Sequence, residues 1–126
     1  MKLIAAAFGI LLLVSCAIRP TPQQLATADY GPPPADYHQQ IQTYYATNLV
    51  NPVGVIIESE SPQKWWMPIP QSRDAFYYGW AVCGYINTQN RYGGYSGRNR
   101  TFSFFYQGKL LGSEWGTQAW QACQGK

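Results

Sequence analysis

Two acidic residues and one histidine are the side chains in this sequence that could support acid–base chemistry. Glu58 and Glu60 stand two positions apart, so on a strand both carboxyl groups would point to the same face. A carboxylate pair of this kind is what hydrolysis of a glycosidic bond requires. His38 is the only histidine, so a nucleophile activated by an imidazole would have to use it. We expect instead that the two acids solubilise a turn, that His38 is a solvated helix residue, and that the protein is not an enzyme.

Three cysteines supply the thiol chemistry of the chain. Cys83 and Cys123 remain as a pair if Cys16 is modified, and an even pair in an exported protein predicts one disulfide. Closing a loop of about 40 residues would stabilise the fold by roughly 4 kcal/mol in the chain-entropy model. The alternative is two independent buried thiols. One histidine and two paired cysteines do not make an ordinary zinc site, so we expect no metal and no cofactor.

The third cysteine closes an N-terminal segment with the features of an export signal. Lys2 is followed by an apolar run over residues 3–14, which is shorter than the about 20 residues of a membrane-spanning helix. The sequence Leu-Val-Ser-Cys at 13–16 resembles the lipobox of bacterial lipoproteins. This resemblance implies that residues 1–15 are removed, that Cys16 is lipidated, and, from the following Ala17, that the protein lies at the outer membrane. An ordinary signal peptide is the alternative.

A segment rich in glycine and asparagine, residues 87–100, is the strongest candidate for a binding surface. Gly93, Gly94 and Gly97 permit positive φ angles, so they predict a compact and specifically bent loop. Tyrosine and arginine dominate the energetic hot spots of protein interfaces. The candidate partner-binding residues are Arg91, Tyr92, Tyr95, Arg98 and Arg100. The alternative is a purely structural connection, in which glycine and asparagine only solve a backbone problem.

The same region carries a resemblance to a known family. Residues 82–97 fit the pattern V-C-x-x-x-N-x-x-N-x-x-G-G-Y-x-G, after a helix that ends at Asn51-Pro52. This pattern resembles a family of small proteobacterial exported proteins and lipoproteins, over about residues 37–113. The resemblance supports the domain limits and the importance of the loop. The family is uncharacterised in function, so it contributes no reaction and no catalytic residue.

Trp65 and Trp66 form a second candidate surface. Adjacent side chains of an extended segment point to opposite faces, so we expect one tryptophan to be buried and the other exposed. An exposed indole beside prolines could stack on a sugar of the cell wall. Peptidoglycan binding through Trp65 or Trp66, helped by the arginine-rich loop, is therefore the alternative function, while packing in the core or at a sheet edge is the simpler explanation.

Composition limits the classes of partner. The formal net charge is +3, and part of it belongs to the segment that would be removed. Such a small excess of positive charge does not indicate nucleic acid binding. Five tryptophans, ten tyrosines and five phenylalanines give a small domain a large apolar area, which helps it to fold at this size.

The elements that must position these residues can be read from the periodicity of the chain. Residues 16–35 contain five prolines and predict an extended tether. Asp36 is expected to be the N-cap of a helix, with Gln39 completing a capping box, and the helix should end at Asn51-Pro52. Strand patterns cover residues 53–57, 64–69, 75–87, 101–106 and 109–115, with a tight hairpin at Gln107-Gly108. Residues 117–123 predict a short terminal helix.

These elements predict an α+β fold over residues 36–126. One N-terminal helix should pack on a three- to four-stranded antiparallel meander, followed by a short C-terminal helix and stapled by one disulfide. The function that fits best is a non-enzymatic, lipid-anchored envelope protein that binds a protein partner through residues 87–100. Its expected contacts are the membrane through the lipid on Cys16, an envelope protein and, as the alternative, peptidoglycan.

Overall fold

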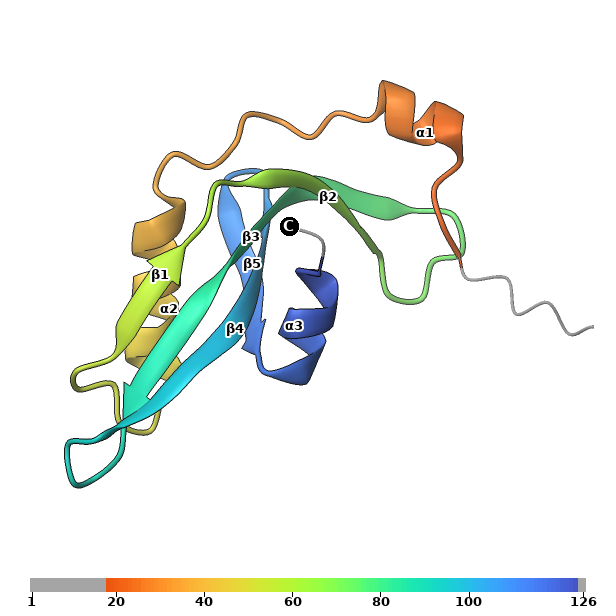
Figure 1. Ribbon diagram of the computed structural model, residues 1–126. Helices are drawn as coiled ribbons and strands as arrows, with labels where there is room; N and C mark the ends of the chain where they lie inside the picture. Colours follow the sequence, from red (N-terminus) through yellow and green to blue (C-terminus); the bar gives the residue numbers. More distant parts are fainter. Residues whose placement is uncertain (1–17, 125–126) are drawn as a thin grey trace, which may run out of the picture.

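The computed structural model describes residues 18–124; the expected signal segment 1–15 and the expected lipidation site Cys16 lie outside the described residues. The elements follow one another in this order: α1 (Pro22–Thr27), α2 (Tyr37–Asn48), β1 (Ile56–Ser59), β2 (Gln63–Pro68), β3 (Phe76–Gln89), β4 (Tyr95–Tyr106), β5 (Lys109–Trp115) and α3 (Thr117–Ala122). Figure 1 shows an antiparallel sheet with helices packed against it. The expected α+β class is therefore confirmed, and the strand over residues 109–115 has the predicted bounds.

The sheet has five strands in the order β1-β3-β4-β5, with β2 also paired to β3. The prediction of three to four strands is wrong because β3, with 14 residues, is long enough for two successive partners on one edge. Ser59 pairs with Gly84 and Gln63 with Ala81, so three residues on one side oppose two on the other. Pro62 lies in this bulge, where the missing N–H of proline interrupts no ladder hydrogen bond.

The region expected to be a loop is mostly strand. β3 continues to Gln89 and β4 begins at Tyr95, so the turn that joins them covers only residues 90–94. Asn87 pairs with Arg98 and Gln89 with Tyr95, which leaves an extra residue on β4. Gly97 occupies this bulge with φ 103°, and this left-handed conformation is what glycine permits inside a strand. We call residues 85–100, two strands and their turn, the β3–β4 hairpin.

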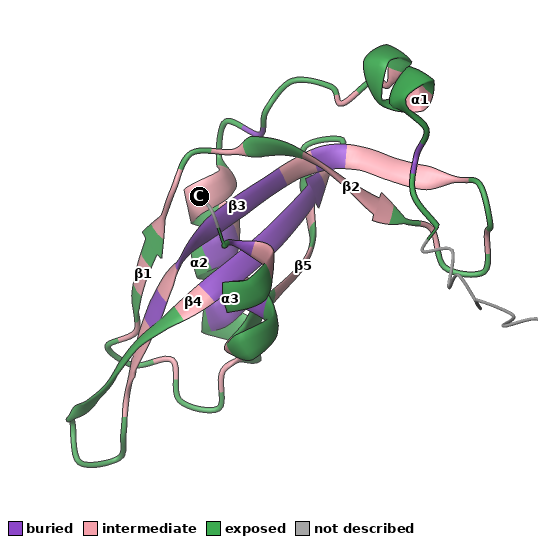
Figure 2. Ribbon diagram, turned by 45° about the vertical axis from the view of Figure 1, so that its right-hand side comes forward, coloured by how far each residue is buried: buried purple, intermediate pink, exposed green. Residues whose placement is uncertain are grey.

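Two hydrophobic clusters lie on opposite faces of the sheet. The cluster under α2 contains Ile41 and Tyr45 of the helix with Val82, Ile86 and Phe105 of the sheet. The cluster under α3 contains Ala81, Cys83, Phe102, Phe104, Ala119 and Cys123. Alternating side chains of β3 and β4 thus feed both clusters, and Figure 2 shows the buried residues concentrated in the central parts of these strands. The β3–β4 hairpin extends from this centre toward solvent.

Helix α2 forms over residues 37–48, but its N-terminal cap differs from the prediction. Asp36 is the N-cap residue, yet its side chain makes no capping hydrogen bond to the backbone, and the box with Gln39 is absent. The Asp36 Oδ1 instead accepts a hydrogen bond from Gln40 Nε2 at 2.8 Å. Gln40 also reaches the edge of β5, where its Nε2 donates to Gly108 O and its Oε1 accepts from Leu110 N. The amide thus binds helix to sheet rather than closing a local box.

A disulfide joins the sheet to the C-terminal helix. Cys83 of β3 and Cys123, the residue that ends α3, form the expected bond across a sequence separation of 40 residues. The bond lies in the cluster under α3, where Cys123 is 3% exposed. The predicted pairing of the two cysteines is confirmed.

The segment before α2 is not simply extended. Residues 22–27 form α1, whose capping box joins Thr21 and Gln24, and this helix was missed because its single proline and its polar residues show no apolar periodicity. The chain then crosses the sheet, where Trp80 Nε1 donates to the carbonyl oxygens of Tyr30 and Gly31 at 3.1 Å. Pro34 is buried. Within residues 18–35, the predicted tether is therefore partly packed onto the domain.

Candidate binding surfaces

The turn of the β3–β4 hairpin is held in shape by asparagine side chains. Asn90 Oδ1 accepts hydrogen bonds from the backbone N–H groups of Tyr92 and Gly94, at 2.9 and 3.0 Å. Asn87 Oδ1 accepts from Gly97 N at 3.0 Å and so supports the bulge. Gly93 has φ 82°, in agreement with the expected use of glycine at positive φ. The glycine and asparagine residues therefore build a defined frame.

The side chains displayed on this frame are exposed. Tyr92 has 82% of its surface accessible, and the Arg91 guanidinium lies 5.1 Å from the centroid of the Tyr92 ring. Tyr95, at the start of β4, is 46% exposed and donates its hydroxyl hydrogen bond to Gly54 O at 2.9 Å. Tyr95 therefore ties the hairpin to the loop before β1, whereas Arg91 and Tyr92 stand at the tip.

Farther along β4, the other two arginines form a layered cluster with residues of β1 and β3. The ring of Tyr85 lies beneath both guanidinium groups, 4.0 Å from Arg98 and 4.6 Å from Arg100. Arg98 pairs with Glu58 at 2.5 Å, and Arg100 pairs with Glu60 at 2.8 Å. We call these five residues the arginine–tyrosine cluster. It uses both carboxylates that the sequence offered as a hydrolytic pair, so each of them is already bonded to a guanidinium.

The two ion pairs of the cluster differ in burial. The Arg98 side chain is 54% exposed, whereas that of Arg100 is 9% exposed and also donates to Gly84 O at 3.3 Å. The hydrogen bond to Glu60 raises the pKa of Arg100 above its ordinary value, against the opposing effect of burial. Arg100 therefore belongs to the packing of the sheet, and Arg98 offers much more surface to a partner.

His38 is not the solvated residue that the sequence indicated. Its side chain is half-buried, and Nδ1 lies 2.7 Å from the hydroxyl oxygen of Ser59 on β1. This bond joins α2 to the edge of the sheet. The pairing was missed because Ser59 is 21 residues away in the chain and approaches only when the helix docks.

The two adjacent tryptophans belong to opposite faces of β2, but the prediction that one is buried and the other exposed is wrong. Both are half-buried. Trp65 packs edge-to-face with Phe102 at 5.4 Å between ring centroids, and Trp66 with Phe76 at 5.5 Å. Because β2 is an edge strand, side chains from both of its faces reach a shared groove beside α1, of about 710 Å³.

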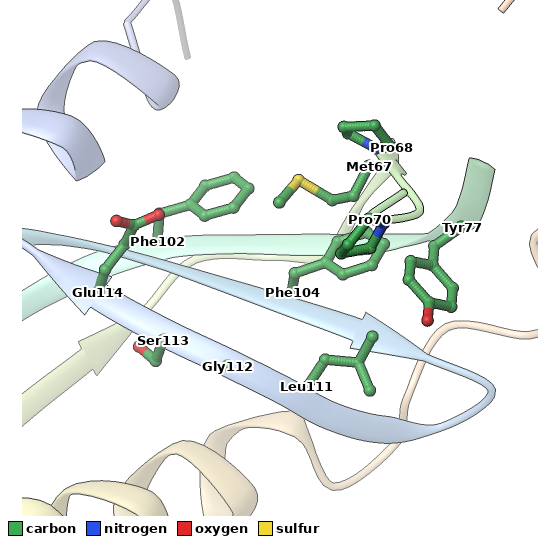
Figure 3. Close-up of a pocket in the computed structure, with 10 residues that line it drawn as sticks. All are labelled: Met67, Pro68, Pro70, Tyr77, Phe102, Phe104, Leu111, Gly112, Ser113 and Glu114. Carbon is green, nitrogen blue, oxygen red and sulfur yellow. The ribbon is translucent and has the colours of Figure 1, made fainter. Parts of the chain in front are cut away.

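A second groove of about 410 Å³ lies on the α3 side of the sheet, and no local sequence pattern indicates it. Figure 3 shows Met67, Pro68, Pro70 and Tyr77 at one end, Phe104 and Leu111 along it, and Glu114 at the other end near Phe102. The residues come from β2, the β2–β3 turn, β3, β4 and β5. Only knowledge of the strand pairing could have brought them together.

Residues 18–124 contain no cluster of three or more histidine, cysteine or acidic residues that could hold a metal ion. None of the helices within this range is both long enough and apolar enough to cross a bilayer.

Comparison with known proteins gives no relative from which a function could be transferred. No protein-family model, no curated protein and no solved structure matches this chain. Function therefore has to be inferred from the surfaces described above.

Proposed function

We propose that this protein is a non-enzymatic lipoprotein of the bacterial outer membrane that binds a protein partner through the tip of the β3–β4 hairpin. The anchor is the lipid expected on Cys16, and the main contact residues are Arg91 and Tyr92. Tyr95 and Arg98 extend the contact surface along β4. Arg100, whose side chain is 9% exposed, supports that surface through its bonds to Glu60 and Gly84.

The observation that carries this proposal is the exposure of Tyr92 on a rigid turn. A tyrosine ring that is 82% exposed is stabilised little by the rest of the fold, while its backbone N–H is fixed by Asn90. Because this backbone is already fixed, little of its conformational entropy is lost when a partner covers the side chain. Tyrosine and arginine are also the residue types that contribute most to binding energy at the centre of interfaces.

The position of the hairpin in the fold also supports the proposal. In Figure 1, α1 and the turn of the β3–β4 hairpin lie at opposite ends of the molecule. Cys16 precedes α1 by six residues. A lipid at Cys16 would therefore hold the α1 end near the membrane and direct the hairpin toward proteins in the space beyond it.

Photo-crosslinking in living cells tests this proposal directly. A photoreactive amino acid at position 92 should give one discrete protein adduct. The matched control is position 107, because Gln107 is also an exposed turn residue, in the hairpin between β4 and β5. Equal adducts from both positions, or no adduct from position 92, would contradict partner binding through the tip.

A double variant separates binding from folding. Arg91→Ala with Tyr92→Ala should abolish the complex with the crosslinked partner, measured by co-purification, because both side chains lie at the tip. The melting temperature should stay near that of the wild type, since surface substitutions of this kind usually change stability by less than about 0.5 kcal/mol. Retained binding in a folded double variant would rule out the tip as the contact site.

A further inference from the structure

The groove beside α1 has a composition that the partner-binding proposal does not use. It is lined by Arg19, Leu25, Tyr30, Lys64, Trp65, Trp66, Met67 and Pro68. We call it the α1–β2 groove. Five of these eight residues come from β2, and the other three come from α1 and the chain on either side of it. The groove is therefore closed by the same segment that connects the domain to Cys16.

The groove combines cationic side chains with aromatic and apolar ones. Its lining contains two cationic side chains, Arg19 and Lys64, both exposed, and within residues 18–124 no carboxylate contributes to it. Lys64 Nζ lies 5.2 Å from the centroid of the Tyr30 ring, which holds the ammonium group at the rim. Tryptophan and tyrosine beside lysine and arginine are the side chains that proteins place at the boundary between lipid headgroups and acyl chains.

The groove also lies close to the expected lipid. Arg19 follows Cys16 by three residues, which span at most about 11 Å of extended chain. The two apolar side chains nearest this end, Ile18 and Leu25, are 49% and 37% exposed. A lipid on Cys16 would bring both of these residues, and the groove behind them, within reach of the bilayer surface.

We propose that the α1–β2 groove binds the headgroup region of a bilayer that contains anionic phospholipid. In this arrangement Arg19 and Lys64 contact phosphate groups, while Trp66 and Leu25 enter the boundary with the acyl chains. The location of the groove at a bilayer rests on the lipid anchor of the proposed function. The affinity of the groove for an anionic headgroup does not depend on that anchor. The domain is then held in one orientation on the membrane instead of swinging about its anchor.

The test uses the full chain with Cys16→Ser, so that no acyl chain on this residue takes part. Monomeric dihexanoylphosphatidylglycerol is titrated, and the indole N–H resonances of the tryptophans are followed by NMR. The Trp66 signal, assigned with Trp66→Phe, should shift saturably, while those of Trp115 and Trp120 should not move. Dihexanoylphosphatidylcholine, which lacks the net negative charge, should bind more weakly.

A matched pair of lysine variants sharpens this test. Lys64→Gln should weaken binding of the anionic lipid about fivefold, and Lys64→Gln with Arg19→Gln about 30-fold, as expected for cations at an anionic surface. Lys109→Gln removes an equal charge from an exposed position on β5 and should leave the affinity unchanged. An equal effect of the two single lysine variants, or no shift of Trp66, would overturn the proposal.

Two other measurements distinguish lipid binding by the groove from glycan binding and from the proposed function. If soluble peptidoglycan fragments shift Trp66 and the anionic lipid does not, the groove is a glycan site and the membrane proposal is wrong. Mass spectrometry of protein extracted from cells reports separately whether Cys16 is acylated, and the adduct at position 92 reports the partner. The lipid titration can still be interpreted if Cys16 is not acylated or if position 92 gives no adduct.

Discussion

The inner and outer halves of the β3–β4 pair use one continuous ladder but are stabilised differently. In the inner half, residues 80–83 pair with residues 102–105, and helices cover both faces. In the outer half, residues 85–89 pair with residues 95–100, and apart from Ile86, which is buried under α2, the side chains are held mainly by ion pairs, asparagine amides and stacked guanidinium groups. Val82 is 1% exposed in the inner half, whereas Tyr95 is 46% exposed in the outer half.

This difference separates folding from recognition along a single pair of strands. Burial of apolar side chains contributes most of the stability of a small domain, whereas exposed ion pairs contribute about 0–1 kcal/mol each. Exposed residues of the outer half can therefore change with little effect on folding, whereas Ile86, which is 0% exposed, belongs to the cluster under α2.

Phe105→Ala should have the largest effect, because it empties the centre of the inner half. Phe105 is 0% exposed and packs in the cluster under α2. Loss of a buried phenylalanine costs about 3–5 kcal/mol, which is a large part of the stability of a domain of this size. Urea denaturation should report this loss, with Phe105→Leu as a milder control. A loss below about 1 kcal/mol would show that the inner half is not the stabilising region.

Removing the disulfide should rank next. Cys83→Ala with Cys123→Ala releases a cross-link of 40 residues, for which the chain-entropy model gives a loss of about 4 kcal/mol before any relief of strain. A reducing agent should lower the melting temperature of the wild type toward that of the variant and leave the variant unchanged. If the wild type and the variant have the same melting temperature under oxidising conditions, α3 is held on the sheet by packing alone.

Replacing the more buried arginine of the cluster, Arg100, should lower the stability more than replacing the exposed Arg98. Arg100→Met removes bonds to Glu60 and Gly84 from a side chain that is 9% exposed and should cost about 1–2 kcal/mol. Arg98→Met removes an ion pair whose side chains are 54% and 50% exposed and should cost less than about 1 kcal/mol, declining at high salt. Equal losses of stability in the two variants would show that the cluster acts as one unit. They would also contradict the separation between the inner and outer halves.

Alkaline pH should weaken the inner half through Tyr45. Burial raises the pKa of this phenol above the usual value of about 10, although its hydrogen bond to Ser113 acts in the opposite sense. In the unfolded chain the phenol loses its proton near pH 10, so its contribution to stability is present below that pH. The contribution is lost as the pH rises through the higher pKa of the folded state.

Urea denaturation between about pH 9 and pH 11 checks this dependence. Tyr45→Phe should reduce the alkaline loss of stability, and at neutral pH it should cost about 1 kcal/mol through the lost bond between the Tyr45 hydroxyl and Ser113, 2.6 Å long. The remaining alkaline loss should include Tyr78, whose pKa is also raised by desolvation. An identical pH profile in the variant would assign the whole effect to other groups.

The parts of the fold that depend on local patterns were predictable from sequence. The presence of helix α2, the approximate positions of the strands, the hairpin at Gln107 and the short α3 follow from periodicity and turn residues. The bounds were less accurate, since α2 ends at Asn48 and not at Asn51-Pro52, and β1 covers residues 56–59 and not 53–57. Gln107 and Gly108 have φ angles of 52° and 81°, as a tight two-residue hairpin requires. The disulfide followed from the number of cysteines in a chain that was expected to be exported.

The errors concern features that depend on a partner far away in the sequence. The first half of β4 reads as a loop because its glycines and arginines are poor strand formers, yet pairing with β3 imposes the strand. Arg98 and Arg100 are 40 residues from their acidic partners, so neither ion pair has a local signal. The predicted capping box of Asp36 and Gln39 is absent, and Asp36 instead accepts from Gln40, whose amide also bonds to Gly108 and Leu110, about 70 residues away in the chain.

The bonds of Gln40 have a further consequence for how copies of this protein meet. An edge strand presents unpaired N–H and C=O groups that can recruit a strand from another molecule, which is a common start of aggregation. The Gln40 amide occupies the N–H of Leu110 and the C=O of Gly108, as a neighbouring peptide unit would. The opposite edge is interrupted by Pro62 and Pro68 and carries Lys64. When copies of the protein are crowded together, both edges of the sheet therefore hinder strand pairing between neighbouring molecules.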